Sequence, residues 1–157
     1  MPARKPTALK QQKGTLQNCR ANKNEPKLAP ELPPPPDGLD ERVVEAYMIH
    51  GKRLLDMRVL TRADAGSLAA MAQAWVDWRR ANEALESFIQ ENMSEYYVSG
   101  DLIKAHPAVG VRNEADRRYR AWCQSFGMTP SDRAKVAAID TPNEKSSMAK
   151  LLEMKTG

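Results

Sequence analysis

The side chains that could support chemistry are few in this sequence and lie far apart. Cys19 and Cys123 form no CxxC pair, and His50 and His106 are the only histidines among the 157 residues. Four such scattered residues do not suit a zinc site or a catalytic triad. We therefore expect two reduced thiols, with Cys123 buried in a helix, and a structural or surface role for His50.

Motifs of the common enzyme mechanisms are also missing. The chain contains no GxxxxGK[ST] phosphate-binding loop, no GxSxG and no HExxH. Carboxylates are frequent between residues 77 and 91, but they alternate with arginines, which is typical of a solvated helix surface. The sequence therefore predicts a protein that is not an enzyme and that has no catalytic residues, no metal site and no cofactor.

Basic residues are the feature with the clearest chemical use. The net charge is +4, and the first 37 residues hold seven basic and three acidic side chains, while the rest of the chain is balanced. Spaced cations on a flexible chain suit contacts to DNA phosphates through counterion release. A solubilising tail is the alternative. The seven candidates for DNA binding are Arg4, Lys5, Lys10, Lys13, Arg20, Lys23 and Lys27.

The composition of these 37 residues disfavours folding. They contain no Phe, Trp, Tyr, Val or Ile, and they hold eight of the eleven prolines. Such a segment cannot bury enough apolar surface to offset the entropy of ordering. The run 33–36 predicts an extended polyproline II spacer about 12 Å long. We interpret residues 1–37 as a flexible, disordered basic arm, residues 38–139 as a folded core and residues 140–157 as a tail.

Apolar residues recur with a period near 3.6 after Gly38, which predicts helices in the first half of the core. Asp40 is a good N-cap for a helix over about 41–57. Thr61, with Asp64 reaching back to it in a variant of the capping box, starts a long helix over about 62–92.

The second half of the core is predicted to hold a hairpin and two more helices. Residues 94–104 indicate a short β-hairpin around a Ser-Gly-Asp turn. A third helix opens at Pro107 and ends before Gly127, and a fourth runs from Pro130 to about Ile139. The expected fold class is mainly all-α: a long central helix packed in a helical hairpin, with two further helices and one short β-hairpin.

The third helix carries four arginines that are further candidates for phosphate contacts. Glu114 and Asp116 partly compensate them, so the same residues also fit a solvated charged surface. They are Arg112, Arg117, Arg118 and Arg120.

The long helix shows a heptad pattern over about three heptads. Its members step by three and four residues and are Leu68, Met71, Trp75, Trp78, Asn82, Leu85 and Ile89. A second, narrower apolar stripe lies on an adjacent face, from Ala65 to Val76. Either both stripes are covered within one subunit, or one of them meets a neighbouring subunit. The second alternative predicts an oligomer.

The tail over 140–157 is weakly amphipathic and too short to form a stable helix alone. Its apolar residues Met148, Leu151, Leu152 and Met154 predict a segment that becomes helical by docking into a partner's groove. No apolar run approaches the ~20 residues of a membrane span, and the start of the chain lacks a signal-peptide pattern. With a mean hydropathy of −0.62, this favours a soluble intracellular protein.

Several short motifs occur in an order that points to a known family. The first part of the chain contains Lys-Pro-Thr-Ala-Leu-Lys at 5–10, Asn-Glu-Pro-Lys at 24–27 and Leu-Pro at 32–33. Leu-Thr-Arg-Ala-Asp at 60–64, His-Pro at 106–107 and Phe-Gly-Met-Thr-Pro-Ser-Asp-Arg-Ala at 126–134 complete the series. Over residues 4–136 the chain resembles the small terminase subunits of tailed bacteriophages and prophages. It departs from them at 14–18, where the family often has a G-N-P-G-type run.

The resemblance implies a non-enzymatic factor that packages DNA in the cytoplasm of a bacterial host. Members of the family assemble into homo-oligomeric rings, recognise double-stranded viral DNA at the packaging start site and deliver it to the large terminase subunit. The large subunit carries the ATPase and nuclease, which the small subunit regulates. In some phages an HNH endonuclease joins the complex. The alternative is an assembly adaptor that docks on the large subunit and binds little DNA itself.

Overall fold

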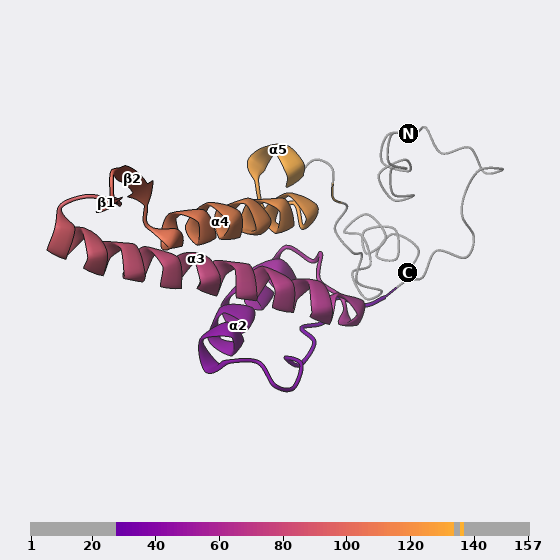
Figure 1. The fold of residues 1–157 in the computed structure, drawn as a ribbon. Helices are drawn as coiled ribbons and strands as arrows, with labels where there is room; N and C mark the ends of the chain where they lie inside the picture. The colour runs from indigo at the N-terminus through magenta and orange to yellow at the C-terminus, as the bar shows by residue number, and fades with distance from the viewer. Residues whose placement is uncertain (1–27, 134–135, 137–157) are drawn as a thin grey trace, which may run out of the picture.

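A long helix forms the spine of the molecule, and one helix packs on each side of it (Figure 1). The computed structural model describes residues 28–133 and residue 136. The elements in chain order are α2 (Glu41–Asp56), the 3-10 turn η2 (Arg62–Asp64), α3 (Ala65–Asn92), β1 (Tyr96–Ser99), β2 (Leu102–Ala105), α4 (Pro107–Ser125) and α5 (Pro130–Arg133). The predicted fold class, mainly α-helical with one small hairpin, is confirmed.

Capping side chains determine where α2 and α3 begin. The carboxylate of Asp40 accepts a hydrogen bond from the backbone N–H of Arg42 at 3.1 Å. The carboxylate of Asp64 accepts from the backbone N–H and the hydroxyl of Thr61, at 2.9 and 2.7 Å. Both predicted caps are therefore present. The one difference is that the first turn of the long helix, residues 62–64, is a 3-10 turn.

The two strands form an antiparallel hairpin at the far end of α3. Tyr96 pairs with Ala105 and Ser99 pairs with Leu102, and Gly100 in the turn has a φ of +63°. A hairpin of this size needs support from other elements. Tyr97 supplies part of it by packing edge-on against Phe88 of α3, with 6.4 Å between the ring centroids.

α4 runs back along α3 on a different face from α2 (Figure 1), and its second half meets α2 where Tyr119 lies 5.5 Å from His50. The Nδ1 of His106 accepts from the backbone N–H of Ala108 at 3.2 Å, and Pro107 takes the first helical position. Gly127 turns the chain after α4 with a φ of +68°. The helix expected over 130–139 is seen as the single turn α5, and most of its second half lies outside the described residues. None of the described helices is long and apolar enough to cross a membrane.

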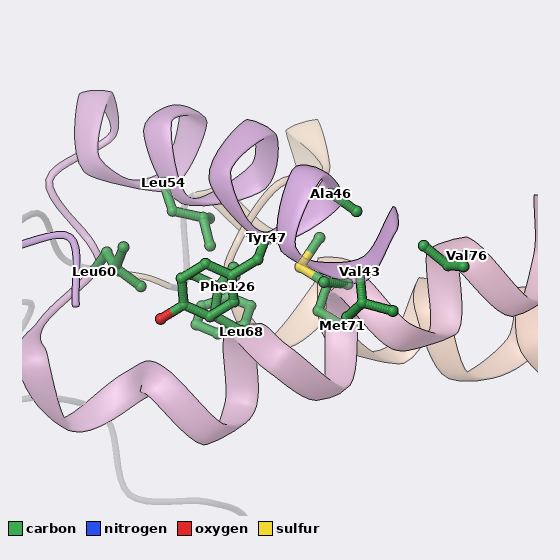
Figure 2. Packing of buried hydrophobic residues seen from close by; sticks show 10 residues of the cluster. Val43, Ala46, Tyr47, Leu54, Leu60, Leu68, Met71, Val76 and Phe126 are labelled. Atoms are coloured by element: carbon green, nitrogen blue, oxygen red, sulfur yellow. The ribbon is translucent and has the colours of Figure 1, made fainter. Parts of the chain in front are cut away.

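The apolar core lies between α2 and the first half of α3, where Phe126 and Leu60 close it (Figure 2). Burial of each large aliphatic or aromatic side chain contributes about 1.5–3 kcal/mol. This cluster therefore holds α2 against the spine. Its buried members are Val43, Ala46, Tyr47, Leu54, Leu60, Leu68, Met71, Ala72, Val76 and Phe126.

The segment before α2 is attached to this core by its backbone. The N–H of Glu31 donates to the carbonyl of Leu60 at 3.1 Å, and Pro30 forms an isolated β-bridge with Thr61. Residues 30 and 31 thus run beside the chain that leads into α3.

The first residue of the polyproline run is also packed, so the spacer expected at 33–36 is attached to the core at Pro33. Pro33 is fully buried, and its carbonyl accepts a hydrogen bond from the buried hydroxyl of Tyr47 at 3.1 Å. Leu32 fits against Gly51, where a side chain on the helix would collide with it. The composition of the segment does not predict this docking, because it depends on only two apolar side chains and one carbonyl. Residues 30–33 are therefore attached to the folded body, and the carbonyl of Pro34 also accepts from the Tyr47 hydroxyl at 3.3 Å.

Candidate nucleic-acid and subunit interfaces

The described residues contain no group of three or more His, Cys, Asp or Glu side chains placed to hold a metal ion. Cys123 is a free, half-buried thiol on α4 beside Tyr119. Burial raises the pKa of the Cys123 thiol and carries the pKa of Tyr119 well above its usual range. Both groups therefore stay protonated at neutral pH and are poor nucleophiles.

The four predicted DNA-binding arginines all lie on α4, and each forms an ion pair with a carboxylate. Their charges are therefore largely compensated within the chain. The pairs are Arg112–Glu95 at 2.7 Å, Arg118–Asp77 at 3.1 Å, Arg120–Asp116 at 2.8 Å, and Arg117–Glu114.

Two of these arginines connect separate elements. Arg112 joins α4 to the base of the hairpin through Glu95, and about a quarter of its side chain is exposed. Arg118 joins α4 to α3 through Asp77, whose carboxylate also accepts from Gln73 at 2.7 Å. Removing such a partner would loosen the packing, so these two residues are better placed to hold the fold than to bind phosphate.

The other two arginines project from the surface of α4. The side chains of Arg117 and Arg120 are 78% and 74% exposed, and their partners sit three or four residues away on the same helix. Exposed pairs of this kind contribute only ~0–1 kcal/mol. A phosphate can therefore replace either carboxylate partner at small cost, and these two residues remain candidates for DNA contact.

The described body as a whole is acidic. Residues 28–133 hold 13 basic and 16 acidic side chains, whereas residues 1–27 hold seven basic and one acidic. The excess positive charge thus belongs to the first 27 residues. The seven cations predicted there to bind DNA lie outside the described residues, as do Met148, Leu151, Leu152 and Met154 of the tail.

The predicted seam of α3 is covered in part by the same chain. Leu68, Met71 and Leu85 are buried, and Trp75, Trp78, Asn82 and Ile89 are partly exposed. The second stripe is covered as well, since Ala72 and Val76 are buried in the core shared with α2. Packing within the chain thus covers part of each stripe. A role for the seam between subunits stays a prediction.

Two tryptophans of the seam pack where α4 crosses α3. The rings of Trp75 and Trp78 stack with 5.2 Å between centroids, and Trp75 also contacts Tyr119 of α4 at 5.1 Å. Asn82, the polar member of the seam, donates its amide N–H to the carbonyl of Trp78 at 2.9 Å. Its polar group is therefore satisfied within α3.

Comparison with known proteins identifies the family. A family profile described as phage terminase, small subunit, matches residues 43–143, which is well over half of the chain. The chain belongs to this family. The family is generally the non-catalytic component of the terminase and associates with the large subunit and DNA. Comparisons with curated proteins and with solved structures give no significant match.

The terminase-like motifs of the core coincide with caps and turns in the structure. Leu60 to Asp64 contain the capping box that opens the long helix, and His106 caps α4. In the Phe-Gly-Met-Thr-Pro-Ser segment, the hydroxyl of Thr129 accepts from the backbone N–H of Asp132 at 3.2 Å. These motifs therefore set the ends of helices.

The sequence alone leaves open whether His50 is a structural or a surface residue, and the structure buries it. Only 1% of its surface is exposed, and neither ring nitrogen has a hydrogen-bond partner among the described residues. Its ring meets Trp75 edge-on at 5.7 Å and lies 5.5 Å from Tyr119. Burial, helped by the nearby Arg53 charge, lowers the pKa of His50 from 6.5 to about 4.

The signal for this burial was present in the sequence. His50 follows Tyr47 by three residues and precedes Leu54 by four, which places it in the middle of the buried face of α2. The structure thus gives α2, α3 and α4 a shared junction around a neutral imidazole.

Proposed function

We propose that this small subunit is the ring-forming, non-catalytic DNA-recognition component of a viral genome-packaging motor. It recognises viral DNA in the host cytoplasm, delivers it to the large terminase subunit and regulates the ATPase and nuclease of that subunit. In phages that use one, an HNH endonuclease joins the assembly. The observation that carries the proposal is the family match over residues 43–143.

The charge distribution supports the proposal that the arm, and not the body, provides most of the DNA affinity. Residues 1–27 hold seven basic side chains against one acidic, while the body is acidic and its α4 arginines are paired. Long-range attraction of a polyanion follows net charge. The arm therefore provides most of the DNA affinity, and Arg117 and Arg120 add contacts once DNA lies against α4.

The tail is the proposed contact for the large subunit. Three of its apolar residues, Met148, Leu151 and Leu152, follow helical spacing and Met154 comes two residues later, so the tail is a weakly amphipathic segment that can dock in a groove. Arm and tail would then hold DNA and the motor at the same time.

The experiment that tests the DNA role compares three chains for binding to a fluorescent duplex: the full chain, residues 28–157, and residues 1–139 as the matched control. Anisotropy is measured at several salt concentrations. If all seven arm cations contact phosphates, log K falls with log salt with a slope of about −6. We expect the slope to collapse for 28–157 and to persist for 1–139. Equal affinity and slope for all three chains would refute the role of the arm.

A specific observation also favours the second candidate, an assembly adaptor with little DNA binding of its own. All four α4 arginines are paired, and the described body has more acidic than basic residues. The adaptor hypothesis predicts that the full chain binds DNA weakly and that this affinity changes little with salt. It also predicts that the chain captures the purified large subunit only when the tail is present. A steep slope for the full chain excludes it.

A further inference from the structure

The exposed apolar surface of the described residues is concentrated at two places. Nine large apolar side chains are exposed, and eight of them fall into two groups. The hairpin group comprises Met93, Tyr96, Val98, Leu102, Ile103 and Val111. The second group is Met48 and Ile49 on α2. Clustered exposure of this kind marks a surface for protein contact.

One face of the hairpin is entirely apolar. Val98 pairs with Ile103 and Tyr96 with Ala105, so these four side chains project from the same face of the sheet. Val98 and Ile103 are 73% and 76% exposed. Tyr97 has the opposite orientation and packs on Phe88, so the apolar face points away from α3.

The hairpin is held in place from behind. The carboxylate of Glu95 at its base pairs with Arg112 at 2.7 Å, and the carbonyl of Glu95 accepts from the N–H of His106 at 2.9 Å. The ring of His106 also packs on Phe88, with 4.5 Å between centroids. The apolar face is therefore preorganised, and a partner that binds it loses little entropy in ordering it.

The second group borders a groove of about 210 Å³ between α2 and α3. This volume is smaller than the ~300–1,000 Å³ of typical small-molecule pockets and suits one or two inserted side chains. The lining combines four apolar residues with four charged ones of both signs. They are Ala46, Ile49, Trp75 and Val76, and Arg42, Glu45, Arg79 and Glu83.

Hairpin and groove lie at different places along the spine. The hairpin joins α3 to α4 at the far end of α3, whereas the groove is formed by α2 and residues 75–83 of α3 (Figure 1). The hairpin of one chain thus does not reach the groove of the same chain, and each surface needs a partner from outside.

We propose that the hairpin of one copy packs into the α2–α3 groove of the next copy. A protruding apolar face and a groove lined by four apolar and four charged residues, at separate places on a chain, make a head-to-tail contact, which closes into a ring when the rotation allows. Asp101 lies in the turn of the hairpin, and Arg42 and Arg79 line the groove, so the carboxylate of the turn meets a guanidinium of the next copy. Lys104, in contrast, lies on the other face of the hairpin with Tyr97. The inference rests on one part of the proposed function, namely that copies of the chain assemble with one another.

The test uses two full-length variants with one disabled surface each. Ile103→Glu places a charge on the hairpin face, and Ile49→Glu places one at the groove. Ser99→Glu on the other face of the hairpin and Lys52→Glu on the next turn of α2 are the matched controls, since both positions are exposed. Circular dichroism verifies that each variant folds, and light scattering after size exclusion gives the mass.

We expect the wild type and both controls to have a mass several times 17.6 kDa, and each Glu variant alone to be a monomer. An equimolar mixture of Ile103→Glu and Ile49→Glu should give a one-to-one dimer and nothing larger, because it contains one intact hairpin and one intact groove. A mixture that stays monomeric overturns the proposal. Assembly lost in Ile103→Glu but kept in Ile49→Glu also overturns it and indicates hairpin-to-hairpin packing.

Two further outcomes distinguish this contact from assembly through a different surface. If removal of residues 140–157 abolishes assembly to the same extent as Ile49→Glu, the tail occupies the groove and the inference is wrong. If both Glu variants keep the wild-type mass, the hairpin-to-groove contact is wrong, and the proposed ring stands without it. If the wild type is monomeric at all concentrations, the proposed ring is wrong as well.

Discussion

Acidification should weaken the fold through one residue, His50. The folded state holds this imidazole neutral among Trp75 and Tyr119, with its pKa lowered from 6.5 to about 4. The unfolded chain binds the proton near pH 6.5, so it takes up more protons than the folded chain as the pH falls. The free energy of unfolding is therefore unaffected by His50 above pH 6.5, and it falls progressively as the pH is lowered from 6.5 to about 4.

The magnitude follows from the pKa difference. A difference of one in pKa corresponds to about 1.4 kcal/mol, so the shift of His50 is equivalent to about 3 kcal/mol at full extent and about 2 kcal/mol by pH 5. This is a large share of the 5–15 kcal/mol that typically stabilises a domain. Asp and Glu side chains contribute little to the loss of stability in this range, because carboxylates ordinarily take up protons mostly below pH 5.

Urea unfolding at several pH values between 7.5 and 5 measures this loss, at one protein concentration because assembly also affects stability. His50→Phe is the matched variant. It keeps an aromatic ring against Trp75 and Tyr119 but has no nitrogen to protonate. The wild type should lose about 2 kcal/mol more than His50→Phe between pH 7.5 and 5. Parallel losses in the two proteins would refute the assignment to His50, because they would place the proton uptake at other residues.

Three other predictions concern the core, the docked segment and α4. Tyr47→Phe removes the hydrogen bond to the carbonyl of Pro33 and should lower the free energy of unfolding by about 1 kcal/mol in urea titrations; an unchanged value would contradict the docking of the segment. Trp75→Ala should cost less than the ~3–5 kcal/mol of a fully buried tryptophan, because Trp75 is partly exposed; the loss is measured as a lower thermal midpoint of the helical signal. Arg117→Gln combined with Arg120→Gln should change stability by less than about 1 kcal/mol and make the salt slope of DNA binding shallower by up to about 2. An unchanged slope would exclude α4 from the DNA contact.

Local features of this chain were predictable from sequence because they depend on neighbouring residues. The capping carboxylates of Asp40 and Asp64 act within three residues, and the predicted and observed ends of α2 and α3 differ by at most three residues. Gly127 marked the end of α4 for a similar reason, since its φ of +68° suits glycine.

Features that depend on distant parts of the chain were not predictable in this way. Arg118 pairs with a carboxylate 41 residues away in sequence and Arg112 with one 17 residues away. Periodicity reveals that a side chain lies on a helix face, but not which charge meets it. The docking of Pro33 was missed for the same reason, since its acceptor role depends on Tyr47, which lies 14 residues later.

The docked segment also determines which parts of the fold bear a tension applied to the N-terminal residues. Residues 30–33 are held by a backbone hydrogen bond to Leu60, by Leu32 in the notch at Gly51 and by the Tyr47 hydroxyl. These contacts lie side by side along the segment, so tension applied ahead of Leu28 loads them together in shear. The force then passes into α2 through Tyr47 and Gly51 and into the entrance to α3 through Leu60. If the arm binds DNA as proposed, tension on the DNA is transmitted to these two helices.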